Sequence, residues 1–405
     1  MTNQYPVSIS RICVRTASTA LAFVVVLGAI QPAETQTYTV LYTFTGGTDG
    51  ANPISRLVRD KQGNLYGTTG VGGDLSCGGG GGCGTVFKLD TTGVLTTLWS
   101  FTGGADGQYA AGGLVRDSAG NLYGTTLDSN PGFGTVFKVD STGHHTVLHT
   151  FTGPDGESPQ ADLIRDAAGN LYGTAQFGGP HGMGVVFKLD SAANYTVLYD
   201  FRLRDGNNPY AGLIRDSKGN LYGTTFGGGT GHHNGTVFKL GRTGHETILL
   251  NFDGHSGGLW PESDLIRDSS GNLYGTTNRG GNPGCVQYGC GTVFKLDSSG
   301  HETVLYAFKR SGDGNSPNAG LVRDAQGNLY GATPTGGPYY GTLFKIDGTG
   351  KETILYHFHG SSDGEYPASG LIRDAAGNLY GTAALGGNFN CNPKYGCGVV
   401  FKLVP

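Results

Sequence analysis

Charge is scarce in this sequence. Asp, Glu, Lys and Arg make up 14% of the 405 residues, against about 25% in ordinary soluble domains. No run of Lys or Arg occurs and the net charge is −4, so the basic patch expected of a nucleic-acid-binding protein is missing. Apolar residues with a helical period do not persist beyond a turn or two, which excludes a helical fold.

Catalytic and cofactor motifs are missing as well. No Ser/His/Asp arrangement or isolated carboxylate pair stands out, and the glycine run at 78–82 does not precede a helix, as a phosphate-binding loop would. The spacing of oxygen ligands in a calcium loop is also absent. We therefore expect no cofactor, no metal site and no enzymatic activity.

Glycine and aromatic residues are plentiful instead. The chain has 75 Gly, 21 Tyr and 19 Phe. Its β-branched and aromatic residues cluster between Gly, Asn and Asp, which is typical of short strands joined by tight turns. The pattern predicts an all-β fold.

The segment LIRDAAGNLYGT, residues 163–174, is one of seven near-copies. Each repeat continues with a variable loop, a G(T/V)(V/L)FK segment, a turn and a T(V/I/T)LxxF segment, so we predict four strands of about five residues per repeat. Self-similarity with a period near fifty residues indicates a repeat architecture. The copies begin at Leu57, Leu114, Leu163, Leu213, Leu265, Leu321 and Leu371.

The order of the copies predicts how the fold closes. The first TVLYxF-type segment, residues 39–44, precedes the first repeat, and the chain stops after Phe401 and Lys402 without another copy. The N-terminal segment can therefore supply the fourth strand that the last repeat lacks, which removes the exposed edges of an open array. We predict a seven-bladed β-propeller with four antiparallel strands per blade, forming a single domain over residues 37–405 and closed by strand 39–44. The second-to-third and fourth-to-first loops would share one face.

The N-terminus differs in kind. Arg11 and Arg15 precede an apolar run from Thr19 to Ile30, which small residues and Pro32 follow. This pattern is typical of a secretory signal peptide, predicted over residues 1–33, and the run is shorter than the roughly 20 apolar residues of a transmembrane helix. A retained N-terminal anchor is the alternative. We expect a monomer that is secreted or held at the outer cell surface, with no membrane span after cleavage.

Six of the seven cysteines form three local pairs. Each pair lies within one second-to-third loop, and its second member comes just before an FK segment. Local pairing in an exported chain predicts three disulfides rather than zinc sites, because no His lies at ligand spacing beside any pair. The pairs are Cys77 with Cys83, Cys285 with Cys290, and Cys391 with Cys397.

Three charged positions recur in all seven repeats, and in the third copy they are Arg165, Asp166 and Lys188. A catalytic residue is not needed seven times. We expect the Asp of Asp-x-x-Gly-Asn to accept backbone N–H groups in a hairpin turn, and the Arg and Lys to pack between neighbouring blades. A positive tunnel for an anion is the alternative. The Asp-Gly pairs of the fourth-to-first loops are also expected to form turns.

Aromatic residues on the variable loops depart from the repeat and are the candidates for ligand contacts. Rings flanked by Gly, Asn and Asp can stack on sugars, anchor a protein partner, or fold back over their own loops. The loop histidines His181, His232 and His233 are expected to be solvated. The candidate binding residues are Phe226, Trp260, Tyr288, Tyr339, Tyr340, Tyr366, Phe389 and Tyr395.

The segments GNLYGTT and G(T/V)VFKLD, behind a signal peptide, resemble the GloVer tandem-repeat family of exported bacterial β-propeller proteins. The resemblance covers residues 39–403. Members of that family are called choice-of-anchor proteins because their C-terminal anchors differ. No apolar stretch closes this chain, so we expect release rather than surface attachment. The resemblance implies a location and a repeat type, and no activity.

These observations favour a recognition module that binds a glycan or an extracellular protein through the loop-rich face. The alternative is a polysaccharide-active hydrolase or lyase with its site at the axial opening. Weak candidates for its acid and base groups are Glu157, His181, Glu262 and Glu365. A structural protein of the envelope is the third possibility.

Overall fold

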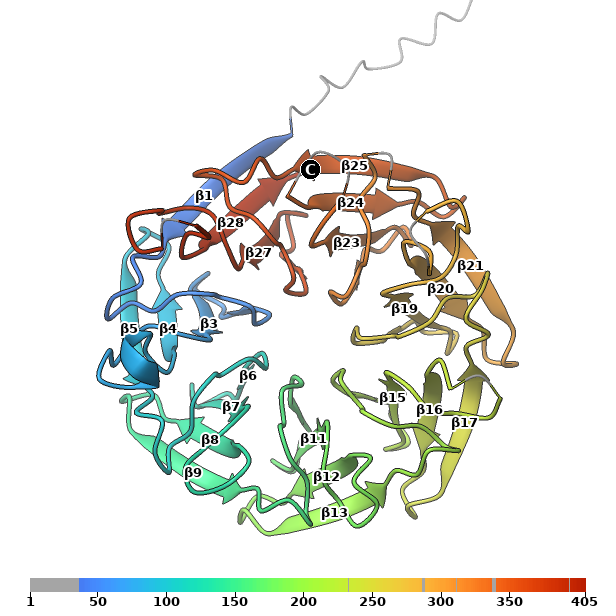
Figure 1. The fold of residues 1–405 in the computed structure, drawn as a ribbon, viewed down its shortest axis with the longest axis horizontal. Helices are drawn as coiled ribbons and strands as arrows, with labels where there is room; N and C mark the ends of the chain where they lie inside the picture. Colours follow the sequence, from blue (N-terminus) through green and yellow to red (C-terminus); the bar gives the residue numbers. More distant parts are fainter. Residues whose placement is uncertain (1–35, 232, 286–287, 311, 337–339, 393) are drawn as a thin grey trace, which may run out of the picture. The chain divides into compact units, whose positions relative to one another are not determined.

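A computed structural model describes residues 36–231, 233–285, 288–310, 312–336, 340–392 and 394–405. The predicted signal peptide at 1–33 lies outside this range, as do His232 and Tyr339. The described residues form seven four-stranded antiparallel sheets arranged in a ring (Figure 1). The predicted seven-bladed β-propeller is confirmed.

In each blade, strands adjacent in sequence are hydrogen-bonded neighbours. Blades 1 to 6 are β2–β5, β6–β9, β10–β13, β14–β17, β18–β21 and β22–β25, and blade 7 is β26–β28 with β1. The first strands are two residues long, shorter than predicted, because the residues before them leave the ladder to line the axial opening. They are β2 (Val58–Arg59), β6 (Val115–Arg116), β10 (Ile164–Arg165), β14 (Ile214–Arg215), β18 (Ile266–Arg267), β22 (Val322–Arg323) and β26 (Ile372–Arg373).

The second and third strands form the middle of each blade. The second strands are β3 (Leu65–Thr69), β7 (Leu122–Thr126), β11 (Leu171–Ala175), β15 (Leu221–Thr225), β19 (Leu273–Thr277), β23 (Leu329–Thr333) and β27 (Leu379–Ala383). The third strands are β4 (Thr85–Leu89), β8 (Thr135–Val139), β12 (Val185–Leu189), β16 (Thr236–Leu240), β20 (Thr292–Leu296), β24 (Thr342–Ile346) and β28 (Val399–Val404).

The fourth strands form the rim of the ring (Figure 1). They are β5 (Leu95–Ser100), β9 (His145–Thr150), β13 (Tyr195–Asp200), β17 (Glu246–Asn251), β21 (Glu302–Ala307) and β25 (Glu352–His357). In blade 7 this place is taken by β1 (Thr37–Thr43), which pairs antiparallel with β28 from Thr37 opposite Val404 to Thr43 opposite Val399. The predicted closure by the N-terminal strand is therefore confirmed.

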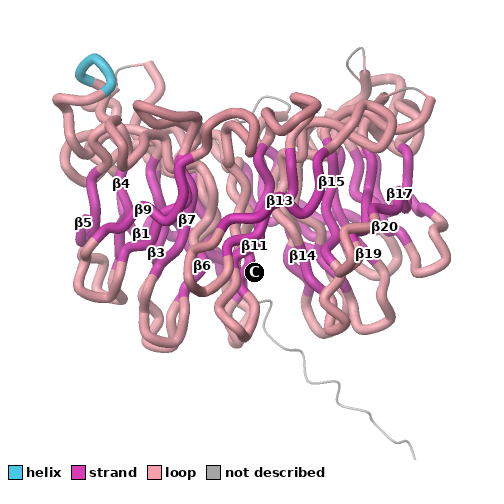
Figure 2. The backbone as a smooth tube through the Cα atoms, turned by 90° about the horizontal axis from the view of Figure 1, so that it is seen from below, coloured by secondary structure: helices cyan, strands magenta, loops and turns pink. Residues whose placement is uncertain are grey.

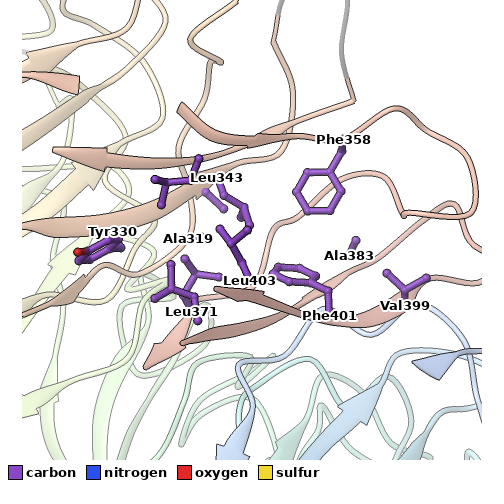
Figure 3. Packing of buried hydrophobic residues seen from close by; sticks show 12 residues of the cluster. Ala319, Tyr330, Leu343, Phe358, Leu371, Ala383, Val399, Phe401 and Leu403 are labelled. Atoms are coloured by element: carbon purple, nitrogen blue, oxygen red, sulfur yellow. The ribbon is translucent and has the colours of Figure 1, made fainter. Parts of the chain in front are cut away.

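The hydrophobic interior lies between the blades. A Cβ placed on Gly173 would be 2.7 Å from Cζ of Phe187, so the glycine of the LYG segment is required by the close approach of this ring. Phe187 in turn meets Phe151 of the preceding blade edge to face, with ring centroids 5.3 Å apart. Figure 3 shows the corresponding packing between blades 6 and 7, where Phe358 lies 5.5 Å from Phe401.

The repeated Asp has the predicted turn role. Oδ1 of Asp166 accepts the N–H groups of Ala168 and Asn170, and Oδ2 accepts the Nδ2 group of Asn170 and the hydroxyl of Tyr172. These hydrogen bonds favour the carboxylate and hold the pKa of Asp166 below its usual value, although burial acts in the opposite direction. The same four hydrogen bonds recur in five other blades, and Asp324 of blade 6 forms the three with Asn328 and Tyr330.

The repeated Arg links neighbouring blades, as predicted. The guanidinium carbon of Arg215 in blade 4 lies 5.7 Å from the ring centroid of Tyr172 in blade 3. Each of the seven arginines lies in this way over the tyrosine of the preceding blade, at 5.3 to 5.9 Å. The arginines are therefore held in place by cation–π contacts around the ring.

The connections alternate between two faces (Figure 2). First-to-second and third-to-fourth connections are tight turns, and the second-to-third and fourth-to-first connections are longer and vary in length; we call the surface they form the loop face. The blade 1 loop contains a short 3-10 helix, η1 (Gly78–Gly80). The three predicted disulfides are confirmed, one each in the second-to-third loops of blades 1, 5 and 7.

Candidate binding site on the loop face

Each fourth-to-first loop contains a residue other than glycine in the left-handed backbone conformation. Trp260, with φ of 58°, is one of them. Its N–H donates to the carbonyl of Asn234 in blade 4 and its carbonyl accepts from the N–H of Asn278 in blade 5, both at 3.0 Å. These bonds between blades offset a backbone cost of about 1–3 kcal/mol and fix the direction of the side chain. The seven residues are Asn52, Tyr109, Ser158, Asn208, Trp260, Ser316 and Tyr366.

The residue two positions after each of these left-handed residues lies at the opening of the ring, and seven side chains surround it in this way. They line a cavity of about 250 Å³ at the axis. We call them the mouth ring: Ile54, Ala111, Gln160, Tyr210, Glu262, Asn318 and Ala368. The wall formed by blades 3 to 6 is polar or aromatic, whereas blades 7, 1 and 2 contribute Ala368, Ile54 and Ala111.

A second set of residues follows two positions after the mouth ring. It lies deeper in the ring, because each fourth-to-first connection runs from the loop face towards the first strand of the next blade. We call it the floor ring: Arg56, Gly113, Asp162, Gly212, Asp264, Gly320 and Gly370. Six of these line the cavity, and Gly113 lies behind Asp162. The floor ring therefore has charged residues in blades 1, 3 and 5 and glycine in the other four.

The three charged residues converge on the axis. Nε of Arg56 lies 3.0 Å from Oδ2 of Asp162, whose Oδ1 accepts the N–H of Gly113 at 2.5 Å. Oδ1 of Asp264 accepts the N–H of Gly212 at 2.6 Å. Burial and the neighbouring Asp162 raise the pKa of Asp264 to about 6, against the opposing effect of Arg56.

The glycines of the floor ring provide the space for these side chains. A Cβ on Gly212 would lie 2.9 Å from Oδ1 of Asp264 and 3.0 Å from the carbonyl of Asp162. A Cβ on Gly113 would lie 2.5 Å from Oδ1 of Asp162. The cluster of Arg56, Asp162 and Asp264 therefore depends on glycine in the blades between them.

An apolar groove of about 580 Å³ adjoins the axial cavity over blades 3 to 5. Phe226 and Trp260 stack in it with centroids 5.3 Å apart and planes at 18°, and Tyr288 lies 5.9 Å from Trp260. Phe177 and Leu203, both exposed, complete its apolar lining. Tyr210 and Glu262 line both the groove and the axial cavity, so the two form one continuous surface.

Glu262 is the acidic residue at this junction. Its Oε2 accepts the Nδ2 group of Asn278 at 2.9 Å, and burial raises its pKa. The carboxylate also contributes, after burial, to the raised pKa of both Tyr210 and Tyr366. Glu262 therefore lies within electrostatic reach of the two tyrosines on the mouth of the cavity.

The predicted binding residues do not form a single patch. Phe226 and Trp260 come together in the groove, Tyr288 lies beside Trp260 at its edge, and Tyr366 lines the axial cavity. The other described candidates lie elsewhere: the ring of Tyr340 packs against Gly360, Lys394 lies 4.6 Å from the ring centroid of Tyr395, and Phe389 is half-buried in its own loop. Tyr339 lies outside the described residues.

Sequence reasoning missed the charged floor of the cavity. Of the weak acid–base candidates, only Glu262 lines the axial cavity. The ring of His181 pairs with Asp200, and the backbones of Glu157 and Glu365 form bridges with Phe177 and Leu385 in the loops of their own blades. Arg56, Asp162 and Asp264 stand directly before the Leu that opens each repeat, where four copies have glycine. That irregularity was visible in the aligned repeats.

Among the described residues, no group of three or more His, Cys, Asp or Glu side chains is placed to hold a metal ion. In the same part of the chain, no helix is long and apolar enough to cross a membrane.

The Gloeobacter/Verrucomicrobia repeat family matches residues 26–167, 75–287 and 283–405. The chain belongs to this family of tandem-repeat β-propellers. No curated protein matches its sequence.

Solved structures share the fold at low sequence identity. Virginiamycin B lyase from Staphylococcus aureus is similar with a TM-score of 0.60 and 13% identity, over 91% of this chain and 99% of that one. The extracellular domains of a one-component system and of a hybrid two-component system from B. thetaiotaomicron give TM-scores of 0.57 and 0.56, with 12% and 15% identity over 90% and 91% of this chain. The match spans only 39% and 41% of those two chains. The three disulfides are compatible with an extracellular location.

Proposed function

We propose that this protein is an exported recognition module that binds glycans on its loop face, along the groove formed by blades 3 to 5. The observation that carries this proposal is the aromatic platform of Phe226, Trp260 and Tyr288, which continues into the polar axial cavity. Aromatic faces accept the C–H faces of sugar rings, and the flanking polar groups accept and donate hydrogen bonds to hydroxyls.

The composition of the groove favours a glycan over a protein partner. Next to its aromatic residues it presents the amides of Gln176, Asn207 and Asn208, and Oδ1 of Asn207 is buried without a hydrogen-bond partner among the described residues. Alternating rings and amides suit a chain of hydroxyl-bearing units. A hot spot for a protein partner is typically an aromatic anchor surrounded by contacts that exclude water, whereas this groove has polar amides beside its rings.

A polysaccharide-active hydrolase or lyase at the axial opening is the second candidate. It is favoured by Asp264, whose raised pKa would allow a carboxylic acid to donate a proton. Against it, the neighbouring carboxylate of Asp162 is already engaged by the guanidinium of Arg56 and the N–H of Gly113, so it is not available as a second catalytic carboxylate. Release of reducing sugar from a panel of polysaccharides, abolished in Asp264→Asn, would favour this second function over the first.

The test of the glycan proposal is an array of bacterial and plant glycans probed with the wild-type protein and two variants. Trp260→Ala should weaken binding about tenfold, the equivalent of about 1.4 kcal/mol. Tyr109→Ala is the matched control: Tyr109 has the same left-handed backbone and the same hydrogen bonds between blades, but it lines neither the groove nor the axial cavity. Binding to no glycan, or equal losses in both variants, would contradict the proposal.

A further inference from the structure

The axial cavity differs in chemistry and size from the groove that leads to it. It has a floor of three charged side chains, whereas the groove is largely apolar. We propose that the axial cavity holds the terminal residue of a neutral, hydroxyl-rich glycan, so that the protein recognises chain ends. This inference rests on the proposed function, since the groove would hold the following sugar units.

The floor ring carries charged side chains that reach across the axis. Arg56 extends from blade 1 to Asp162 of blade 3, past the glycine of blade 2, and Asp264 reaches in from blade 5. These side chains occupy the centre of the ring below the mouth ring. A glycan that enters from the loop face therefore meets these charged groups at the floor, and its end is expected to rest there.

The groups around the cavity suit sugar hydroxyls. Hydroxyls donate and accept at the same time, and the cavity offers the guanidinium of Arg56 as a donor beside the carboxylates of Asp162 and Asp264 as acceptors. On the polar wall, Oδ1 of Asn318 is buried and has no hydrogen-bond partner within the described part of the chain. The opposite wall, formed by Ile54 among others, is apolar and suits the C–H face of a pyranose.

The charges disfavour acidic sugars. Asp162, Asp264 and Glu262 outnumber Arg56, and Arg56 already pairs with Asp162. A uronate, sulfate or phosphate group would have to enter a site with an excess of carboxyl groups, and the like charges would repel each other within the cavity. A neutral residue avoids that cost.

The size of the cavity favours one residue. Its volume of about 250 Å³ lies below the 300–1,000 Å³ typical of sites for drug-sized ligands. The adjoining groove is more than twice as large, and Tyr210 and Glu262 stand at the boundary between the two. One terminal unit would therefore lie in the cavity and the next units over the aromatic platform.

The test compares free and end-blocked oligosaccharides by isothermal titration. Cellohexaose, maltohexaose and mannohexaose are each used free, with the non-reducing end blocked by a benzylidene group, and with a bulky amide at the reducing end. The key variant, Arg56→Gly/Asp162→Gly/Asp264→Gly, installs the residue that four blades already have at this position, and its melting temperature shows whether it folds. Asp264→Asn is the second, isosteric variant.

The wild-type protein should bind at least one free hexasaccharide, and blocking one of its two ends should weaken binding at least tenfold. In the triple glycine variant the free and blocked forms should bind equally, with an affinity set by the groove alone; Asp264→Asn should reduce the preference in the same direction. Equal binding of free and blocked chains by the wild-type protein would overturn chain-end recognition while leaving groove binding intact. In that case Trp260→Ala should still weaken the binding of both forms, which shows that the groove is used. If the proposed function itself is wrong, no oligosaccharide binds at all.

Discussion

Arg56 Nε and Asp162 Oδ2 lie 3.0 Å apart, although the two residues belong to blades 1 and 3. Blade 2, between them, contributes the N–H of Gly113 to the same carboxylate. One side chain thus connects three consecutive blades at the centre of the ring. The seven repeats are nearly equivalent in their strands, but they differ at the floor ring, where three have a charged residue and four have glycine.

The charged floor should respond to substitution in a non-additive way. Arg56→Gly leaves Asp162 and Asp264 facing each other without their counter-charge, so we expect a loss of about 1–2 kcal/mol in the free energy of unfolding, less than for a fully buried pair because Arg56 is partly exposed. The triple glycine variant removes all three charges and should be less destabilised than Arg56→Gly alone. Urea denaturation of both variants measures this, and a larger loss in the triple variant would count against the interpretation.

Three glutamates at the rim should make the ring more stable in mild acid. Burial, and after it a neighbouring Asp, raise the pKa of Glu246, Glu302 and Glu352 to about 7. Because these pKa values are higher in the folded protein than the ordinary 4.5, folding takes up protons; the stabilisation is complete below about pH 4.5 and is lost as the pH rises through 7.

Glu302→Gln should remove one third of this effect. Tyr195 in blade 3 occupies the equivalent rim position and donates its hydroxyl to the carbonyl of Asp155 at 2.6 Å, and a neutral Gln can donate in the same way. The measurement is the difference in unfolding free energy between variant and wild type, taken at pH 5 and again at pH 8. The turn aspartates are the same in both proteins, so their opposite contribution cancels in this difference. The free energy of unfolding of the variant should rise relative to that of the wild type between pH 5 and pH 8. No change between the two pH values would show that Glu302 titrates normally.

Buried threonine pairs allow a test with an internal reference. Oγ1 of Thr277 lies 2.8 Å from Oγ1 of Thr292 and also accepts the N–H of Thr292. Thr277→Ala leaves the hydroxyl of Thr292 buried without this partner and should cost about 1–3 kcal/mol. Blade 3 has Ala175 opposite Val185 at the same positions, so the double variant Thr277→Ala/Thr292→Val should recover part of that loss. Thermal unfolding of the single and double variants decides between these outcomes.

The fold could be predicted from the sequence because each copy of the repeat carries the strand pattern, and the displaced segment 39–44 shows how the ring closes. The charged floor could not be predicted in the same way. Arg56 and Asp162 are 106 positions apart in the chain, and each resembles a solvated loop residue until the ring places blades 1 and 3 around one axis. The directions in which the side chains of Tyr340 and Tyr395 point depend on second-to-third loops of unequal length, and the repeat gives no pattern for these loops.

The closing strand should open independently when its aromatic contact is removed. Tyr38 of β1 stacks on Tyr356 of blade 6 at 3.9 Å and donates its hydroxyl to the carbonyl of Asp363. Tyr195 makes the same contacts in blade 3, on His149 at 3.8 Å and with Asp155. Tyr38→Ala and Tyr195→Ala should therefore each lower stability by about 2–3 kcal/mol, somewhat below the range for fully buried rings.

The two variants should differ in local opening. The strand that bears Tyr38 is held to blade 7 by its pairing with β28, whereas β13, which bears Tyr195, is continuous with the strands on both sides in sequence. The amides of Thr39 and Lys402, which face each other in the β1–β28 ladder, should therefore exchange with solvent much faster in Tyr38→Ala and at the wild-type rate in Tyr195→Ala under native conditions, because only the first substitution releases a segment that can detach without unfolding a blade. Equal exchange at Thr39 in both variants would mean that the seventh blade opens only when the whole ring unfolds.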